Sequence, residues 1–278
     1  MSQIIPRGLI KHLEWDPNKR NSNPRPAPIA VSPAQNPVVP NLEPSFAEFV
    51  QVGINGISGN PVVISPFELA GYNNMNYDNT HFKLLENGLY MPTPQIFAAH
   101  IRNVFDAHKN GKKMLYADGR EIPADKVEEF YDHLTKNAHN SYGASNIGAW
   151  TWLNARFVEG SGWNNLDLEI VNGMNKGKRE LETSRVKLED CFEEDCWVDY
   201  SFNEQGLIKP NSKSANQSNV IGETLRYWYP RKDYVARFEA YSDGANLYCD
   251  RVPSFTDSSL GVFGCAEGAI AKNSGGSS

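Results

Sequence analysis

Two segments of the chain repeat apolar residues at the spacing of an amphipathic helix. In the first segment, Thr93 can cap a helix, Pro94 suits its first position, and Gly111 can end it. The second segment covers about 123–136, and its apolar face consists of Val127, Phe130, Tyr131 and Leu134. The pattern therefore predicts two helices.

Most of the remaining chain consists of short apolar runs separated by Gly, Asn, Asp and Pro. The strongest strand candidates are residues 157–158, 166–171, 196–202 and 235–240. Few helices beside many irregular strands indicate an α+β fold with a small antiparallel sheet.

The two ends of the chain differ from this central part. Residues 1–20 contain Leu9, Leu13 and Trp15 in an arrangement that predicts a short helix, and residues 21–44 contain seven prolines. Such proline content favours an extended arm over packed structure. We therefore expect an N-terminal arm over 1–44, a globular domain over 45–268 and a flexible tail over 269–278.

Composition narrows the class of protein. The chain has 278 residues, of which 40% are hydrophobic and 22% charged, and its net charge is -6. An acidic chain lacks the basic face that a phosphate backbone requires, so we expect no nucleic-acid partner. No apolar run approaches about 20 residues, so we expect no membrane span. Residues 1–10 contain no basic region followed by a long apolar stretch, so we also expect no signal peptide.

Candidate metal and redox sites are weak. Cys191 and Cys196 are not spaced like zinc ligands, so they form either a disulfide or two free thiols. The acidic residues around them form either a solvated loop or a structural calcium site; they are Glu189, Asp190, Glu193, Glu194 and Asp195. The six histidines form no compact ligand motif. We therefore expect no cofactor, with calcium as the open alternative.

Three segments, in order, resemble the formylglycine-generating-enzyme (sulfatase-modifying factor) family. Residues 89–97 read LYMPTPQIF, residues 148–152 read GAWTW, and residues 260–265 read LGVFGC. The family has a "Tyr-Arg-Leu-Pro-Thr" turn, a "Gly-Asn-Val-Trp-Glu-Trp" segment and a closing "Leu-Gly-Phe-Arg-Cys" at these places. The resemblance implies a C-type-lectin-like domain in which Trp150 and Trp152 anchor the core.

The resemblance stops at the catalytic residues. The enzymes of the family hold copper with two thiols that lie five and ten residues before a cysteine that Cys249 resembles. Gly244 and Glu239 occupy those places here, and neither can supply the thiolate that soft copper prefers. We therefore expect a protein that is not an enzyme.

The segment 240–266 has an unusual composition. It contains no Lys, Glu, Gln, Met or Trp, although the chain has 51 residues of these types, so about five are expected there. Diversity-generating retroelements rewrite template adenines, and an AAC codon can then become Tyr, Asp, Ser, Gly or Arg but none of the five missing types. The segment resembles the diversified stretch of their variable proteins; the alternative is a family-typical loop without such a history.

Within this segment we expect a fixed frame and a variable face. The frame comprises Ala240, Ser242, Ala245, Leu247, Cys249, Pro253, Leu260 and Gly261. Period-2 alternation and paratope-like composition assign ligand binding to the remaining residues. These are Tyr241, Asp243, Gly244, Asn246, Tyr248, Asp250, Arg251, Val252, Ser254 and Phe255.

These observations favour a non-catalytic recognition protein that binds a protein or glycan on another surface, with an undetermined oligomeric state. Two alternatives stay open: an enzyme of this fold with unfamiliar active residues, and a virion or cell-surface attachment protein without diversification. The family reading would place the protein on a cell surface or a virion.

Overall fold

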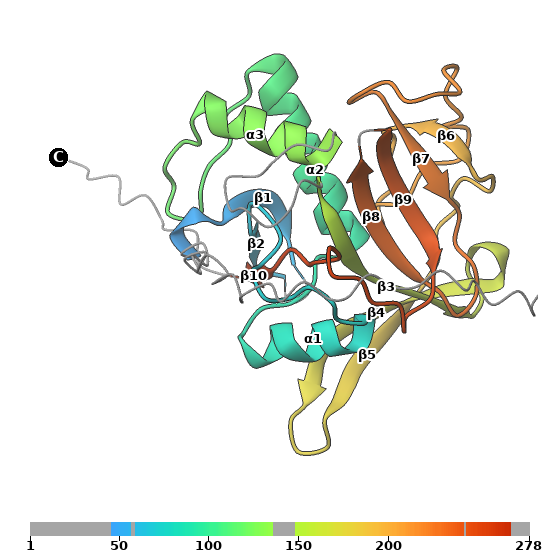
Figure 1. Cartoon of the computed structure of the whole chain (residues 1–278). Coiled ribbons are helices and arrows are strands. Elements are labelled where there is room, and N and C mark those ends of the chain that lie inside the picture. The colour runs from blue at the N-terminus through green and yellow to red at the C-terminus, as the bar shows by residue number, and fades with distance from the viewer. Residues whose placement is uncertain (1–45, 57–58, 136–147, 242, 268–278) are drawn as a thin grey trace, which may run out of the picture. The chain divides into compact units, whose positions relative to one another are not determined.

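The computed structural model describes residues 46–56, 59–135, 148–241 and 243–267 (Figure 1). The helix expected within 1–20, the proline-rich arm and the C-terminal tail lie outside these residues.

The described part of the chain contains three α-helices. They are α1 (Tyr77–Glu86), α2 (Pro94–Asn110) and α3 (Ala124–Thr135). The caps of α2 are those that the sequence predicts: the Thr93 hydroxyl accepts a hydrogen bond from the Ile96 N–H at 3.3 Å, and Gly111 ends the helix in the left-handed conformation. Helix α1 begins in the same way at Asn76, whose side chain accepts from the Asn79 N–H.

The strands form two sheets. Their bounds are β1 (Val50–Asn55), β2 (Pro61–Ile64), β3 (Trp150–Glu159), β4 (Leu166–Asn175), β5 (Glu180–Lys187), β6 (Cys196–Asp199), β7 (Thr224–Trp228), β8 (Val235–Tyr241), β9 (Gly244–Arg251) and β10 (Cys265–Glu267). The smaller sheet has the order β1-β2-β10, and the larger sheet has the order β5-β4-β3-β8-β9-β7-β6. All neighbours in the larger sheet are antiparallel except β7 and β9, which run parallel.

The expectation of two helices and a small antiparallel sheet is therefore wrong. The structure has a third helix, α1, and a mixed sheet of seven strands. Two of those strands escape a search for apolar alternation, and a third is shorter than expected. Strand β5 is exposed along nearly its whole length and reads as polar, β6 ends at Asp199 and not at Phe202, and β7 pairs with a strand distant in sequence.

One face of the larger sheet, here called the inner face, packs against α2 and α3. Its β8 and β9 residues alternate inward and include Phe238, Leu247 and Cys249, which join Phe97 and Phe130 from the helices. These side chains are almost completely buried. Burial of this apolar surface is the main term that holds the helices on the sheet.

Helix α1 covers the opposite, outer face over β3, β4 and β5. There Trp152 packs against Tyr77 of α1, with ring centroids 5.9 Å apart, and its indole N–H donates to the Met75 carbonyl at 3.2 Å. Trp150 and Trp152 are 9% and 1% exposed, which confirms that they are buried. Both residues also contact the C-terminal segment: the Gly261 N–H donates to the Trp150 carbonyl at 2.9 Å, and the Trp152 N–H donates to the Gly261 carbonyl at 3.4 Å.

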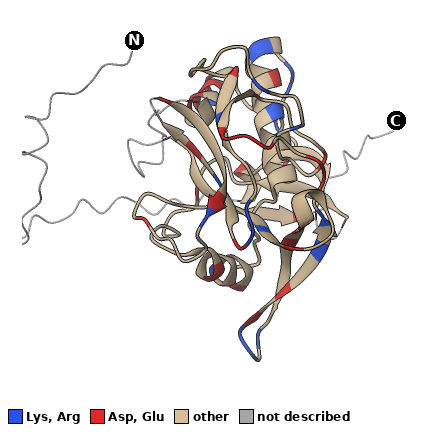
Figure 2. Ribbon diagram, turned by 90° about the vertical axis from the view of Figure 1, so that its right-hand side faces the viewer, with Lys and Arg blue, Asp and Glu red and all other residues tan. Residues whose placement is uncertain are grey.

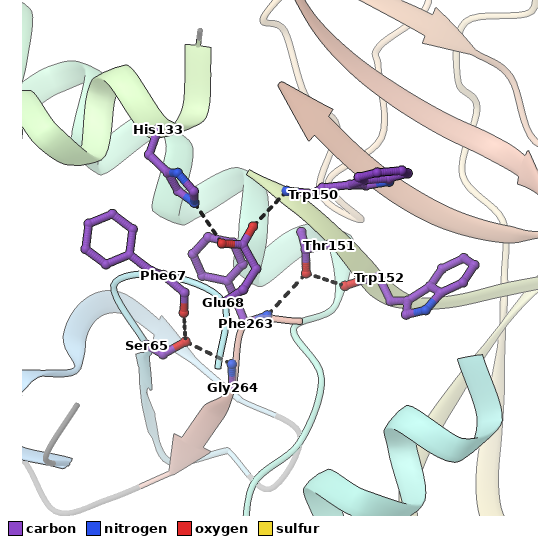
Figure 3. Close-up of polar contacts among 9 residues, drawn as sticks. All are labelled: Ser65, Phe67, Glu68, His133, Trp150, Thr151, Trp152, Phe263 and Gly264. Carbon is purple, nitrogen blue, oxygen red and sulfur yellow. Dashed lines mark hydrogen bonds and ion pairs between the residues drawn. The ribbon is translucent and has the colours of Figure 1, made fainter. Parts of the chain in front are cut away.

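A buried polar network fixes the start of β3 (Figure 3). The Glu68 carboxylate accepts from the Trp150 backbone N–H at 2.7 Å and lies 2.8 Å from His133 Nε2 of α3. The Thr151 hydroxyl accepts from the Phe263 N–H at 3.2 Å. These contacts join the segment after β2, helix α3, strand β3 and the C-terminal segment, so they set the position of Trp150.

Charged side chains of both signs are interspersed along much of the ribbon (Figure 2). Lys176, Lys178 and Arg179 gather at the turn of the β4–β5 hairpin and are exposed. Among the described helices, none is long and apolar enough to cross a bilayer.

Candidate functional site

The outer face of β8, β9 and β7 carries polar and aromatic side chains instead of a second apolar layer. Strand pairing places Trp150, Glu239, Asn246 and Arg226 in one row across the sheet, and Trp152, Arg237, Tyr248 and Trp228 in the next. We call the part beyond α1 the aromatic–arginine face, defined by Trp150, Arg226, Trp228, Arg237, Glu239, Tyr241, Asn246, Tyr248, Arg251 and Phe255.

An ion pair lies at the centre of this face. Arg237 Nη2 lies 2.7 Å from Glu239 Oε2, and the two side chains are 4% and 3% exposed. Burial raises the pKa of the Glu239 carboxyl, and the adjacent Arg237 opposes that rise. Burial also lowers the pKa of Arg237. The Tyr248 hydroxyl donates a second hydrogen bond to Glu239.

Aromatic rings surround the Arg237 guanidinium. Its central carbon lies 5.2 Å from the ring centroids of Trp150 and Phe255 and 5.0 Å from that of Tyr248. A cation near aromatic faces is attracted by the ring quadrupoles, more strongly where water is excluded. The rings thus stabilise a charge that burial alone would disfavour.

A second cluster extends toward β7. Trp228 and Tyr248 stack with their centroids 5.6 Å apart and their planes 14° from parallel. Arg226 lies 5.0 Å from the Trp228 ring and Arg251 lies 3.7 Å from the Tyr248 ring. The result is a platform of two aromatic rings with a guanidinium at each end. Arg226 is exposed and Trp228 half-buried, so the platform reaches the surface.

Several buried N–H groups on this face have no hydrogen-bond acceptor among the described residues. They are Nε and Nη1 of Arg237, Nε of Arg251, and the indole nitrogens of Trp150 and Trp228. Buried donors are normally paired, and those left over in a native structure call for a water, a ligand or another explanation. The aromatic rings around Arg237 explain in part why its N–H groups have no hydrogen-bond acceptor.

The structure brings many of the predicted binding residues to this face, with different exposure. Asp243, Val252, Ser254 and Phe255 are exposed, and Tyr241, Asp250 and Arg251 are half-buried. The expectation that Asn246 and Tyr248 are exposed is wrong, because each is only 8% exposed. They do point away from the inner core, as the alternation predicts, but Trp228, Arg237 and Arg251 pack against Tyr248.

Gly244 belongs to the frame and not to the variable surface. It is buried, its φ is +123°, and a Cβ there would lie 2.8 Å from the Asn219 side chain and 3.1 Å from Trp197. L-residues rarely adopt that backbone conformation, so a side chain at Gly244 would be strained as well as crowded.

Asp250 lies at the edge of the aromatic–arginine face, where Arg231 holds it. Arg231 Nη1 lies 3.0 Å from Asp250 and its Nη2 lies 2.5 Å from Asp195 of the acidic segment. Burial raises the pKa of Asp250, and the two neighbouring arginines oppose that rise. Asp250 is therefore committed to a structural ion pair.

The cysteines are free thiols in the structure. Cys191 and Cys249 lie on the inner side of the sheet next to the buried Tyr227 hydroxyl. Burial raises the pKa of Cys191 to about 12 and that of Cys249 well above its usual range. Thiols of this kind stay protonated near neutral pH and are poor nucleophiles.

The acidic segment around Cys191 contacts the protein's own groups. Glu194 pairs with Lys213, and Glu189 accepts from the backbone N–H of Glu204. Over the described residues, no group of three or more His, Cys, Asp or Glu is placed to hold a metal ion.

Sequence reasoning missed half of the face. Arg226, Trp228, Arg237 and the pairing of Glu239 lie outside the segment whose composition drew attention. A signal for Arg237 and Glu239 is present, because two charges alternate with Ala236, Phe238 and Ala240 on one strand. Nothing in the local sequence indicates that β7 lies beside β9.

No family model, curated protein or solved structure matches this chain. Its function must therefore be argued from the aromatic–arginine face itself.

Proposed function

We propose that the chain is a non-catalytic recognition protein that binds a macromolecular ligand through the aromatic–arginine face. The observation that carries the proposal is the stacked Trp228–Tyr248 platform between Arg226 and Arg251. Trp, Tyr and Arg dominate the binding energy of protein interfaces, because they combine rigid area with directed hydrogen bonds. The rigid sheet beneath supports such a surface with little loss of entropy on binding.

We further propose that segment 240–266 is a diversified stretch of the kind made by diversity-generating retroelements. Its assigned frame residues Ala240, Ala245, Leu247, Cys249, Leu260 and Gly261 are buried, and frame residue Ser242 lies outside the described residues. Of the residues assigned to the variable face, Asp243, Val252, Ser254 and Phe255 are exposed, whereas Gly244, Asn246 and Tyr248 are buried. Exchange of exposed residues costs little stability, typically within about ±0.5 kcal/mol. This division supports the proposal.

The resemblance to the formylglycine-generating-enzyme family stays part of the same proposal. The three segments that carry it lie together: Tyr90 exchanges backbone hydrogen bonds with Cys265 at 2.7 and 2.9 Å, and Trp150 bonds to Gly261. Such proximity is what a shared architecture would require of them.

Binding can be tested by selection from a random peptide library displayed on phage. The test variant combines three exposed changes on the face: Arg226→Ser, Val252→Ser and Phe255→Ser. The matched control is Lys178→Ser, Val186→Ser and Phe46→Ser, which removes the same classes of side chain from other exposed places.

We expect the unchanged protein and the control to enrich the same peptides and the face variant to lose them. Equal enrichment by all three proteins, or enrichment by none, would contradict the proposed binding face.

Diversification is tested separately, by sequencing the DNA around the gene. A near-identical repeat that differs at adenines, beside a reverse-transcriptase gene, is the expected result, and an attachment protein without diversification would lack both.

A further inference from the structure

We infer that the aromatic–arginine face recognises carboxylate groups, and that its ligand is an acidic segment of a protein. The inference rests on the proposed function, since it names the chemistry of the ligand for the same face. Three observations support it: the ion pairs made by the arginines, the excess of unpaired hydrogen-bond donors over acceptors, and the geometry of the platform.

The charge balance leaves two arginines available. Arg231 is paired with Asp195 and Asp250, and Arg237 is paired with Glu239. Within the described residues, neither Arg226 nor Arg251 forms an ion pair with a carboxylate. Arg226 therefore presents an exposed guanidinium without a direct carboxylate partner in the described part of the chain, whereas the charge of Arg251 is partly balanced by the nearby Asp250 and Glu239.

The unpaired polar atoms of this face are mostly donors. Five buried N–H groups of Arg237, Arg251, Trp150 and Trp228 lack an acceptor among the described residues, whereas the unpaired acceptors nearby are Oδ1 of Asp250 and Oδ1 of Asn219. Arg237 is 4% exposed and Trp150 is 9% exposed. A ligand that satisfies such a set must supply acceptor oxygens, and a carboxylate supplies two with a negative charge.

The geometry favours planar, bidentate contacts. Each guanidinium already lies near an aromatic ring, Arg226 by Trp228 and Arg251 by Tyr248, so less side-chain freedom is lost when it binds. Arginine forms paired hydrogen bonds with a carboxylate, and these are stronger than neutral ones. The half-buried Trp228 ring, supported by Tyr248 beneath it, offers apolar area that suits the flanking side chains of a peptide.

The test uses peptides that the face has enriched from the random library. For each we would measure the Kd of the peptide and of its Glu→Gln and Asp→Asn analogues, for the unchanged protein, Arg226→Gln, Arg251→Gln, Arg251→Lys and the remote control Lys178→Gln. Thermal unfolding of each variant checks that the sheet is intact.

We expect the enriched peptides to contain more Asp and Glu than the library. Neutralising an acidic residue should weaken binding about tenfold or more, and this effect should shrink in the Arg226→Gln or Arg251→Gln background, because both partners of one charge-assisted contact are then removed. Arg251→Lys should recover only part of the affinity, and Lys178→Gln should change nothing.

Three outcomes would overturn the inference. Face-dependent peptides without an acidic preference would leave the proposed binding face standing and remove only the carboxylate. A Kd that is unchanged in both Arg226→Gln and Arg251→Gln would also remove the carboxylate contact. Displacement of the peptides by a sialylated oligosaccharide that binds more tightly would assign the carboxylate to a glycan and reject the protein partner.

Discussion

Arg237 and Glu239 form an ion pair 2.7 Å long, although neither side chain is more than 4% exposed. Both residues point to the outer face of β8, two positions apart, where a strand with one buried face would ordinarily meet water. Aromatic rings from three other segments close over them. The pair therefore lies in a low-dielectric site. Removing one partner leaves a buried charge and destabilises the fold, whereas removing both partners leaves none.

The first prediction concerns that pair. Glu239→Leu should lower the free energy of unfolding by about 3–5 kcal/mol, because it leaves the buried Arg237 charge without its partner. The double variant Arg237→Met with Glu239→Leu should recover most of the loss, since no buried charge is left. Urea denaturation measures both. A double variant as unstable as Glu239→Leu would show that the charge is not the cause.

A second prediction concerns Trp152. Its replacement by Ala should cost about 3–5 kcal/mol, the usual range for a buried large aromatic residue. Val186→Thr, at an exposed position of β5, serves as the control and should stay within about ±0.5 kcal/mol. Equal denaturation midpoints for the two variants would be incompatible with the contact between Trp152 and Tyr77.

Stability should fall as the pH drops below about 6.5, because buried histidines resist protonation. Burial lowers the pKa of His81 and of His100 to about 3. The unfolded chain takes up these protons near pH 6.5, so stability that is complete above that pH is lost progressively toward pH 3.

His100→Leu isolates one of these contributions. Between pH 4 and 6 the slope of unfolding free energy against pH should decrease by about 1.4 kcal/mol per unit, the value for one proton. At pH 8 the imidazole of His100 is neutral in both the folded and the unfolded chain. The difference in unfolding free energy between His100→Leu and the unchanged protein at that pH therefore reports the packing effect of the substitution alone. An unaltered slope would mean that His100 is protonated in the folded protein.

Gly244→Ala should destabilise the protein by about 1–3 kcal/mol, because it adds a Cβ at a φ of +123° close to Asn219 and Trp197. Gly53→Ala is the matched control: its φ is +79°, but a Cβ there meets no atom within 4 Å. Thermal unfolding of both variants separates crowding from backbone strain. If Gly244 tolerates Ala better than Gly53 does, position 244 belongs to the exchangeable surface.

The four thiols should differ in reactivity. Cys196 is half-buried, whereas Cys191, Cys249 and Cys265 are buried. An aromatic disulfide reagent at pH 8 should therefore label one thiol quickly in the native protein and four after denaturation. Cys196→Ser should abolish the fast phase. Its persistence would show that one of the buried thiols is accessible.

Much of the local structure was determined by the sequence. Helix α2 begins at Thr93 and ends at Gly111 because capping and the left-handed turn depend on a few neighbouring residues. The alternation in β9 likewise assigns Leu247 and Cys249 to the core and Asn246 and Tyr248 to the other face.

Only the tertiary structure decided how the strands meet and what covers them. The parallel pairing of β7 with β9 places Trp228 beside Tyr248, although 20 positions separate them, and Phe255 and Trp150 close over Arg237 from other segments. Burial and pairing at such distances depend on how the whole chain packs, whereas caps and alternation depend on residues a few positions apart. The sequence therefore indicated which side chains leave the core, and the fold determined which of them form one surface.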